Sequence, residues 1–328
     1  MIIVAVFVAA LLAVFEVGRH LLPDSSKPSA DPHGPALTVK IPSGSTAVEI
    51  GDQLQTAGIV TDGGRFRNYA KEQGEGADFK AGTYRFQAGT DYDRIIDRLN
   101  AGPPPLVTVP LTIPEGLRLT EIADLVAART GITRKQYLAA VQQAAPPPGF
   151  PEARSMEGFL FPATYQIKPK TTAQALVSQQ LTAFEQAFAQ VDMTYAESKN
   201  LTSYDVLKIA SMIEREAAVD HDRPLISAVI YNRLHLGMAL QIDATLLYEL
   251  GSWTHQLTVS ELAAPTPYNT RVVHGLTPTP ICNPGLKSME AAANPAKVDY
   301  LYYVAIGDSG RHYFTDNLDD FNKHAHGG

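Results

Sequence analysis

Two glutamates, Glu214 and Glu216, lie near the end of a stretch with apolar residues at helical spacing, residues 204–218. At 100° per residue the apolar side chains form one stripe, and both glutamates fall at its edges. A carboxyl beside apolar groups is partly desolvated, which raises its pKa. Such a group can donate a proton to the leaving oxygen of a glycosidic bond. The pattern predicts a candidate general acid but does not choose between the two glutamates, and a solvated helix edge is the alternative for both.

The loops after this helix are rich in side chains that hydrogen-bond sugar hydroxyl and acetamido groups. Gln, Asp, Thr, Tyr and Asn gather within residues 237–245 and 266–270, and Tyr248 adds a ring that can stack on a pyranose face. Asn, Thr and Pro also shape turns, so any single one of them could serve the backbone instead. The candidate sugar-binding residues are Gln241, Asp243, Thr245, Tyr268 and Asn269.

Other chemistries find little support in the sequence. The nine histidines form no His-x-x-x-His pair with a helical Glu, and His312, His324 and His326 fall in a polar tail that we expect to be loose. No Gly-x-Ser-x-Gly motif is present, and the single Cys282 excludes an intramolecular disulfide. The net charge of −7 comes without a basic block, which argues against nucleic-acid binding. We therefore expect no metal and no cofactor.

The N-terminal segment predicts a membrane anchor. Residues 1–15 carry no charged or polar side chain, and neither a basic stretch before them nor a small-residue cleavage site after them indicates a signal peptide. Arg19 favours the opposite topology by the positive-inside rule, so the orientation stays open. Residues 19–35 are rich in Pro, Ser and Asp and predict a linker.

The rest of the chain predicts an α+β fold. Alternating and helical patterns follow one another in residues 36–102, and long helical runs dominate 170–250 before a strand-like segment at 300–305. Residues 39–61 and 111–133 share Ile-Pro-x-Gly, Glu-Ile-x-Asp and Gly-Ile in the same order, which predicts the same strand, turn and helix twice. The expected segments are an anchor at 1–18, a linker at 19–35, a small subdomain at 36–102, a second small subdomain or connector at 103–154, and a larger domain at 155–328.

Several stretches in one order resemble the YceG-like endolytic murein transglycosylases. They are MEGFLFPATY (156–165), ASMIEREA (210–217), NRLHLGMALQIDAT (232–245), TPYNT (266–270), GLTPTPICNPG (275–285), YLYYVA (300–305) and His312-x-Phe314-Thr315. The order and spacing hold from about residue 37 to 322, so the resemblance covers nearly the whole chain.

The resemblance implies a single-pass protein of the bacterial inner membrane with its body in the periplasm. It implies a LysM-like subdomain at 36–102 and a catalytic domain at 155–328. The reaction would break MurNAc–GlcNAc bonds inside nascent peptidoglycan strands and leave 1,6-anhydroMurNAc ends. In that family the second glutamate of the Glu-x-Glu pair is catalytic, and it falls on Glu216. Peptidoglycan synthases are the candidate protein partners.

Three positions depart from the family pattern, and two other functions stay open. Ala163 and Arg271 replace a usual Asp and Tyr, and Ala244 replaces a usual Pro. A muramidase-type hydrolase would use a second carboxylate, for which Asp243 and Glu157 are the candidates. A glycan-binding scaffold of the wall-synthesis machinery would need no catalysis.

Overall fold

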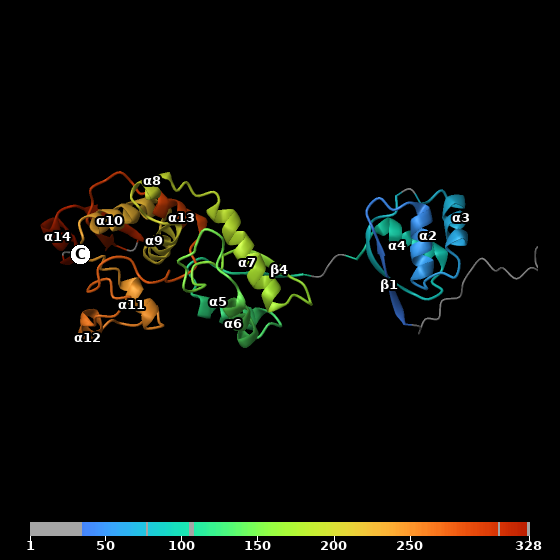
Figure 1. Ribbon diagram of the computed structural model, residues 1–328, viewed down its shortest axis with the longest axis horizontal. Coiled ribbons are helices and arrows are strands. Elements are labelled where there is room, and N and C mark those ends of the chain that lie inside the picture. The colour runs from blue at the N-terminus through green and yellow to red at the C-terminus, as the bar shows by residue number, and fades with distance from the viewer. Residues whose placement is uncertain (1–34, 77, 105–107, 308, 327–328) are drawn as a thin grey trace, which may run out of the picture. The chain divides into compact units, whose positions relative to one another are not determined.

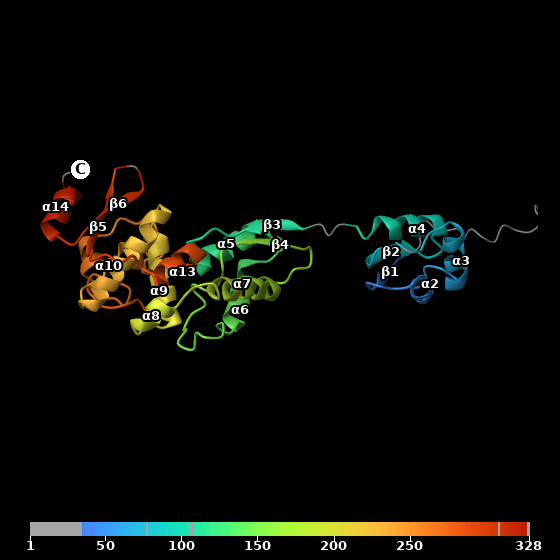
Figure 2. The same ribbon diagram turned by 90° about the horizontal axis from the view of Figure 1, so that it is seen from above.

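The computed structural model describes residues 35–76, 78–104, 108–307 and 309–326 (Figures 1 and 2). The chain divides into two compact units, residues 1–106 and 107–328. The predicted anchor and, except for Pro35, the predicted linker lie outside the described residues. Within those residues, no helix has the length and apolar character that crossing a membrane requires.

The first unit is a two-stranded antiparallel sheet with helices around it. Its elements are β1 (Ala36–Ile41), α2 (Ala47–Thr56), α3 (Gly63–Glu72), β2 (Gly82–Gln87) and α4 (Tyr92–Ala101). Ala36 pairs with Gln87 and Ile41 with Gly82, so two helices lie between the paired strands in the sequence. Leu54, Tyr84 and Ile95 belong to a core of this unit's own.

Two glycines allow α2 and α3 to approach closely. A Cβ atom at Gly51 would lie 2.6 Å from the carbonyl oxygen of Gly63, and one at Gly63 would lie 2.3 Å from that of Gly51. Neither position has space for a larger residue, so the missing side chains set the distance between the two helices.

The second unit begins with the same order of elements. These are β3 (Val109–Thr112), α5 (Leu119–Arg129), α6 (Arg134–Gln143) and β4 (Thr164–Ile167). Val109 pairs with Ile167 in an antiparallel ladder. The predicted repeat of strand, turn and helix is confirmed, and it extends to a second helix and a closing strand.

The turns of the two copies are built alike. Gly44 and Gly116 adopt positive φ angles of 82° and 79°. In each copy a glutamate of the first helical turn caps the helix, because Glu49 accepts the backbone N–H of Thr46 at 2.7 Å and Glu121 that of Arg118 at 2.9 Å. In both copies, therefore, the shared Gly forms the turn and the shared Glu caps the following helix.

Residues between 111 and 150 share the buried core of the second unit. Ile122, Val126 and Tyr137 belong to one apolar cluster with Phe159 and Ile209. The boundary that we predicted at residue 154 therefore does not separate two cores, and the first residues of this unit support the part that carries the glutamates.

The remaining elements form a helical body with a C-terminal hairpin. They are α7 (Ala173–Phe188), α8 (Thr194–Ser198), α9 (Ser203–Glu216), a 3-10 turn (Asp220–Asp222), α10 (Arg223–His235), α11 (Asp243–Glu249), α12 (Val259–Ala263), α13 (Leu286–Ala293), β5 (Tyr302–Ile306), β6 (Arg311–Thr315) and α14 (Leu318–His326). Helix α9 packs against α10, α11 and α13, and Figure 2 shows β5 and β6 beside α10 and α14. The described residues thus have the mixed α/β class that the sequence predicts.

The C-terminal segment is ordered, contrary to our expectation of a loose tail. Tyr302 pairs with Thr315 and Ile306 with Arg311, which places His312 inside a strand. The Tyr303 and Phe314 rings lie 5.8 Å apart on this hairpin. Strand pairing with a segment only a few residues away, together with aromatic packing, overrides the polar composition of the tail.

Candidate active site

Helix α9 holds Glu216 at its C-terminal end. Thr202 caps the helix by accepting the backbone N–H of Asp205 at 3.1 Å, and Ala217 is the C-cap. Val206, Ile209 and Ile213 are fully buried, so the predicted apolar stripe is confirmed. A helix embedded along one face fixes the position from which the Glu216 side chain extends.

The Glu216 side chain lines a cavity of about 410 Å³. Residues of α9, α10, α11, the loops before α11 and after α12, β5, β6 and α14 contribute to its wall. Its charged and strongly polar residues are Glu216, Arg233, Gln241, Asp243, Arg271 and His312. The structure therefore gathers, around one carboxyl, groups from the whole C-terminal half of the chain.

The carboxyl of Glu216 has a raised pKa. Burial is the main cause, and the negative charge of Asp243 acts in the same direction. The Tyr303 hydroxyl opposes the rise by donating to Glu216 Oε2 at 3.1 Å. The hydrogen bond from the backbone N–H of Ala244, near the start of α11, and an electrostatic interaction with His312 also oppose it. Because the pKa is raised overall, the carboxyl of Glu216 favours its protonated form. Tyr303 and Ala244 can still donate hydrogen bonds to the carboxylate.

The neighbouring Glu214 has a different environment. Its Oε1 accepts from Arg223 at 3.2 Å and its Oε2 from the backbone N–H of Gly285 at 3.0 Å. The side chain is 6% exposed and is absent from the cavity wall. Both oxygens of Glu214 bind neighbouring segments. The structure thus distinguishes Glu214 from Glu216, which the helical spacing in the sequence could not do.

Arg233 brings a buried positive charge to the cavity. It donates to the carbonyl oxygens of Leu240 and Leu301, both at 2.7 Å. No carboxylate in the described part of the chain lies within ion-pair distance of it. The residue is 7% exposed, and burial lowers its pKa. Arg233 therefore joins α10 to the loop before α11 and to the residue that precedes β5, and it lines the cavity.

Gln241 and Asp243 are the predicted sugar-binding residues that reach the cavity. Gln241 has a φ of 56°, an unusual conformation for a non-glycine residue that often marks a functional loop. Its backbone N–H donates to Thr270 O at 2.9 Å. Asp243 accepts from Arg271 Nε at 2.7 Å, so the Arg that departs from the family pattern forms an ion pair in the cavity wall.

The other three predicted residues lie outside the cavity wall. Thr245 is fully buried and donates to Ile242 O at 2.7 Å. The side-chain amide of Asn269 donates to three backbone carbonyls between 2.8 and 3.1 Å. The Tyr268 hydroxyl lies 2.8 Å from Thr279 Oγ1, and its ring lies against Tyr248. Their polar groups bond within the loops that hold Gln241 and Arg271, and their contact with the sugar stays a prediction.

Sequence reasoning missed Tyr303, Arg233 and His312. Strand alternation and the pairing of Ala305 with His312 place Tyr303 and His312 on one face of the hairpin. The Tyr-rich segment at 300–305 and the His-x-Phe spacing at 312–314 held a period-two signal that could have found this face. Arg233 had no local signal, because its role depends on carbonyl groups from remote segments.

Glu157 is a second buried carboxyl, and it lies apart from this cavity. Oε1 accepts from the backbone N–H of Leu119 and from Asn283 Nδ2, each at 2.9 Å, and Oε2 accepts from the Tyr248 hydroxyl at 3.3 Å. Burial raises the pKa of Glu157 to about 7. Since Glu157 is no part of the wall around Glu216, only Asp243 shares that cavity as a possible second carboxylate.

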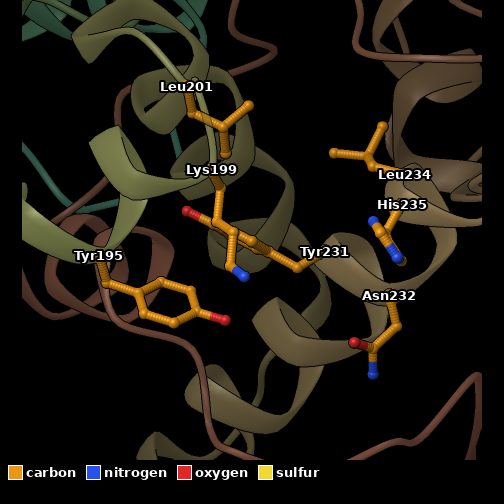
Figure 3. A pocket seen from close by; sticks show the side chains of 7 residues that line it. All are labelled: Tyr195, Lys199, Leu201, Tyr231, Asn232, Leu234 and His235. Atoms are coloured by element: carbon orange, nitrogen blue, oxygen red, sulfur yellow. The ribbon is translucent and has the colours of Figure 1, made fainter.

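A second pocket, of about 290 Å³, lies beside α8 and α10 (Figure 3). It is lined by Tyr195, Lys199, Leu201, Tyr231, Asn232, Leu234 and His235. At 3.6 residues per turn, Tyr231 and His235 lie about 160° around α10 from Arg233, the α10 residue that lines the Glu216 cavity. The lining holds no carboxyl, so carboxyl acid–base chemistry belongs to the cavity around Glu216.

The fold and the cavity define a mixed α/β protein with an acid–base site built on one half-buried carboxyl. A model of the YceG-like family matches residues 39–326, and the chain belongs to that family.

Proteins named endolytic murein transglycosylase are among its relatives. One from Streptococcus pneumoniae (strain D39) is 34% identical over 348 residues, which cover 97% of this chain and 63% of the relative. One from Bacillus subtilis (strain 168) is 32% identical over 324 residues, covering 94% of this chain and 88% of the relative. The chain thus spans less than two thirds of the length of the pneumococcal relative.

A solved structure agrees with the fold. The crystal structure of a yceG-like protein from Listeria monocytogenes is 31% identical and matches with a TM-score of 0.57. The match covers 88% of this chain and 99% of the Listeria chain.

Proposed function

We propose that this chain is an endolytic peptidoglycan lytic transglycosylase, which breaks MurNAc–GlcNAc bonds within nascent strands and leaves 1,6-anhydroMurNAc ends. The observation that carries the proposal is the carboxyl of Glu216, whose pKa burial raises, in a cavity with several hydrogen-bonding groups. The names of the pneumococcal and Bacillus relatives support the same reaction.

In the first step Glu216 acts as the acid. Its protonated carboxyl donates to the bridging oxygen of the departing GlcNAc, the bond between that oxygen and C1 of MurNAc breaks, and positive charge develops at C1. The Glu216 carboxylate that remains is stabilised by the Tyr303 hydroxyl at 3.1 Å and by the Ala244 backbone N–H.

In the second step the sugar supplies its own nucleophile. The C6 hydroxyl of MurNAc attacks C1, a bond between C1 and O6 forms, and the hydroxyl proton returns to the Glu216 carboxylate. Atoms and protons then balance without water or a metal. Because the nucleophile belongs to the same ring, its effective concentration is high and no second enzyme carboxylate is needed.

The cavity wall supplies the sugar contacts in this proposal. The Gln241 carboxamide is held in the wall by its left-handed backbone, and the Asp243–Arg271 pair presents polar edges there. Both can hydrogen-bond hydroxyl or acetamido groups. The hydrogen bonds of Thr245, Tyr268 and Asn269 hold these loops in position.

The first unit is proposed as a LysM-like glycan-binding subdomain. The order strand–helix–helix–strand with antiparallel pairing supports this assignment. A membrane anchor at 1–18, a periplasmic location and association with peptidoglycan synthases belong to the same proposal, and they rest on the apolar N-terminal sequence and the family.

Replacing the acid tests this function. Glu216→Gln keeps the size of the side chain and removes its transferable proton, so release of anhydro-ended fragments from purified sacculi should fall by roughly 10²–10⁴-fold. Glu290→Gln is the matched control, because Glu290 is exposed on α13 and lies outside the cavity. A Glu216→Gln protein that releases these fragments at the wild-type rate would remove Glu216 from the reaction.

The same assay separates the alternatives. Fragments with reducing ends, which weigh one water more than anhydro ends, would indicate a hydrolase. Retention of strands by the wild-type protein without any cleavage would indicate a binding scaffold.

A further inference from the structure

His312 forms a buried pair with an aspartate at the edge of the Glu216 cavity. Its Nδ1 lies 3.0 Å from Asp222 Oδ2, and its backbone N–H donates to the same oxygen at 2.8 Å. Asp222 is 2% exposed. Burial acts to raise the pKa of Asp222, but the hydrogen bonds from His312 and His221 outweigh it and hold the pKa below its usual range. Asp222 is therefore ionised.

The ionised aspartate determines the tautomer of His312. A carboxylate only accepts hydrogen bonds, so Nδ1 must carry the proton, and Nε2 of the neutral ring keeps its lone pair. Nε2 points away from Asp222, and the described residues give it no hydrogen-bond partner. The side chain is 11% exposed and lines the cavity. The fold thus presents one oriented proton acceptor to the cavity.

Tyr303 connects this acceptor with the acid. Its hydroxyl donates to Glu216 Oε2 at 3.1 Å, and its ring lies edge-on to the His312 ring with centroids 5.3 Å apart. The acid and the imidazole therefore occupy one wall of the same cavity.

We propose that His312 is a second proton-transfer residue, which takes the proton of the MurNAc C6 hydroxyl on Nε2 and passes it to the Glu216 carboxylate. The inference rests on the proposed function and deepens its second step. Glu216 gives a proton to the bridging oxygen, His312 receives one as the bond between C1 and O6 forms, and the imidazolium returns it to Glu216. Every proton is accounted for, and the enzyme ends in its starting state.

The relay divides two tasks between two groups. A single carboxyl would have to reach both the bridging oxygen and the C6 hydroxyl, which lie at different places on the sugar. With Asp222 fixing the ring, His312 can stay at the second position, as the buried aspartate of a catalytic triad holds its histidine. The charged and titratable groups around it are Glu216, His221, Asp222, Arg233, Asp243, Arg271 and Tyr303.

The test is imidazole rescue of His312→Ala in the full chain. On purified sacculi this variant should lose roughly 10²-fold in the rate of anhydro-end release, and added imidazole should restore part of the loss. Asp222→Asn, which permits the other tautomer, should also slow the reaction, and the double variant should be no slower than His312→Ala alone.

The control is His255→Ala, because His255 pairs with Glu261 outside the cavity. It should keep the wild-type rate and show no response to imidazole, and thermal melts establish that each variant is folded. A wild-type rate in His312→Ala, or a slow His312→Ala whose rate added imidazole does not raise, would overturn the relay. If Glu216→Gln is inactive in that same series, the proposed function stands while the relay fails; if Glu216→Gln is active, the function itself fails.

Discussion

At the scale of single residues, the environment of Glu216 combines one dominant effect with several opposing ones. Burial raises the pKa of its carboxyl, whereas the Tyr303 hydroxyl and the Ala244 backbone N–H favour the charged form. A general acid must give up its proton and take it back, so partners for both states serve the reaction.

Tyr303→Phe should shift the alkaline limb of the pH–rate profile to higher pH. The protonated carboxyl is the active form, so the rate falls as pH rises through the pKa of Glu216. Removing the hydroxyl removes an interaction that lowers this pKa, and the carboxyl then stays protonated to higher pH. Comparing kcat across pH for both proteins measures the shift. A limb that moves to lower pH would contradict this account of Glu216.

Glu157 should make the protein less stable as pH rises. Its folded-state pKa is about 7, above the ordinary value of 4.5, so the folded state binds its proton more tightly than the unfolded state. The stabilisation is complete below about pH 4.5 and is lost as pH rises through 7, by on the order of 3 kcal/mol. Denaturant unfolding of the wild type at pH 5 and pH 8 measures the loss.

Glu157→Gln is the informative variant for this effect. Its amide is neutral at both pH values and can keep contacts with Leu119, Asn283 and Tyr248. We expect a smaller fall in the free energy of unfolding between pH 5 and 8 than in the wild type. Glu216→Gln, made in parallel, separates the contribution of the other buried carboxyl. An unchanged slope in Glu157→Gln would mean that Glu157 titrates normally.

The sequence could predict a site residue only where its role depends on residues near it in the chain. The apolar stripe of α9 follows from spacing within one helix, so it was predictable. The difference between Glu214 and Glu216 depends on Arg223 and Gly285, which lie further along the chain. Asn269 has the right chemistry for a sugar ligand, but its loop uses every donor, and no local pattern reveals that.

At the scale of elements, the site depends on α9 beneath it and on the hairpin beside it. The helix was visible from its period, whereas β6 was hidden because its polar residues make sense only when paired with β5. The repeat was recognisable in the first strand and helix of each copy, where Gly and Glu have fixed positions. The second helix and closing strand of the second copy could not be predicted from the repeat, since no shared motif marks them.

Thr202→Ala should weaken α9 without altering the chemistry at its other end. The hydroxyl of Thr202 accepts the Asp205 backbone N–H, and losing such a cap costs about 1 kcal/mol. We expect a lower free energy of unfolding and a nearly unchanged kcat, because the α9 core still holds Glu216. Thr120→Ala is a matched control, since that exposed threonine in α5 has no cap role. A loss of kcat as large as that of Glu216→Gln would show that the cap itself controls the site.

At the scale of the whole molecule, two cores imply two folding units. The first unit has its own apolar cluster, and the core of the second unit runs from β3 to α13. The boundary at 106/107 follows shortly after three consecutive prolines in the sequence, residues 103–105.

A protein that begins at residue 107 should fold cooperatively and cleave glycan strands. Every residue of the Glu216 cavity lies within 107–328, so its chemistry needs no group from the first unit. If the first unit binds glycan, the shortened protein should show a higher KM for long strands and a similar kcat. Circular dichroism melts and steady-state kinetics measure both properties. A shortened protein that does not fold would show that the second core is incomplete.

The measurement that tests the central claim most directly is the mass of the chain ends that the intact enzyme makes from purified glycan strands. If one carboxyl transfers a proton to the bridge and the C6 hydroxyl of the same sugar attacks, new muramic ends must carry the internal ether and lack a water. New ends that are reducing sugars, or no new ends at all, would contradict the account.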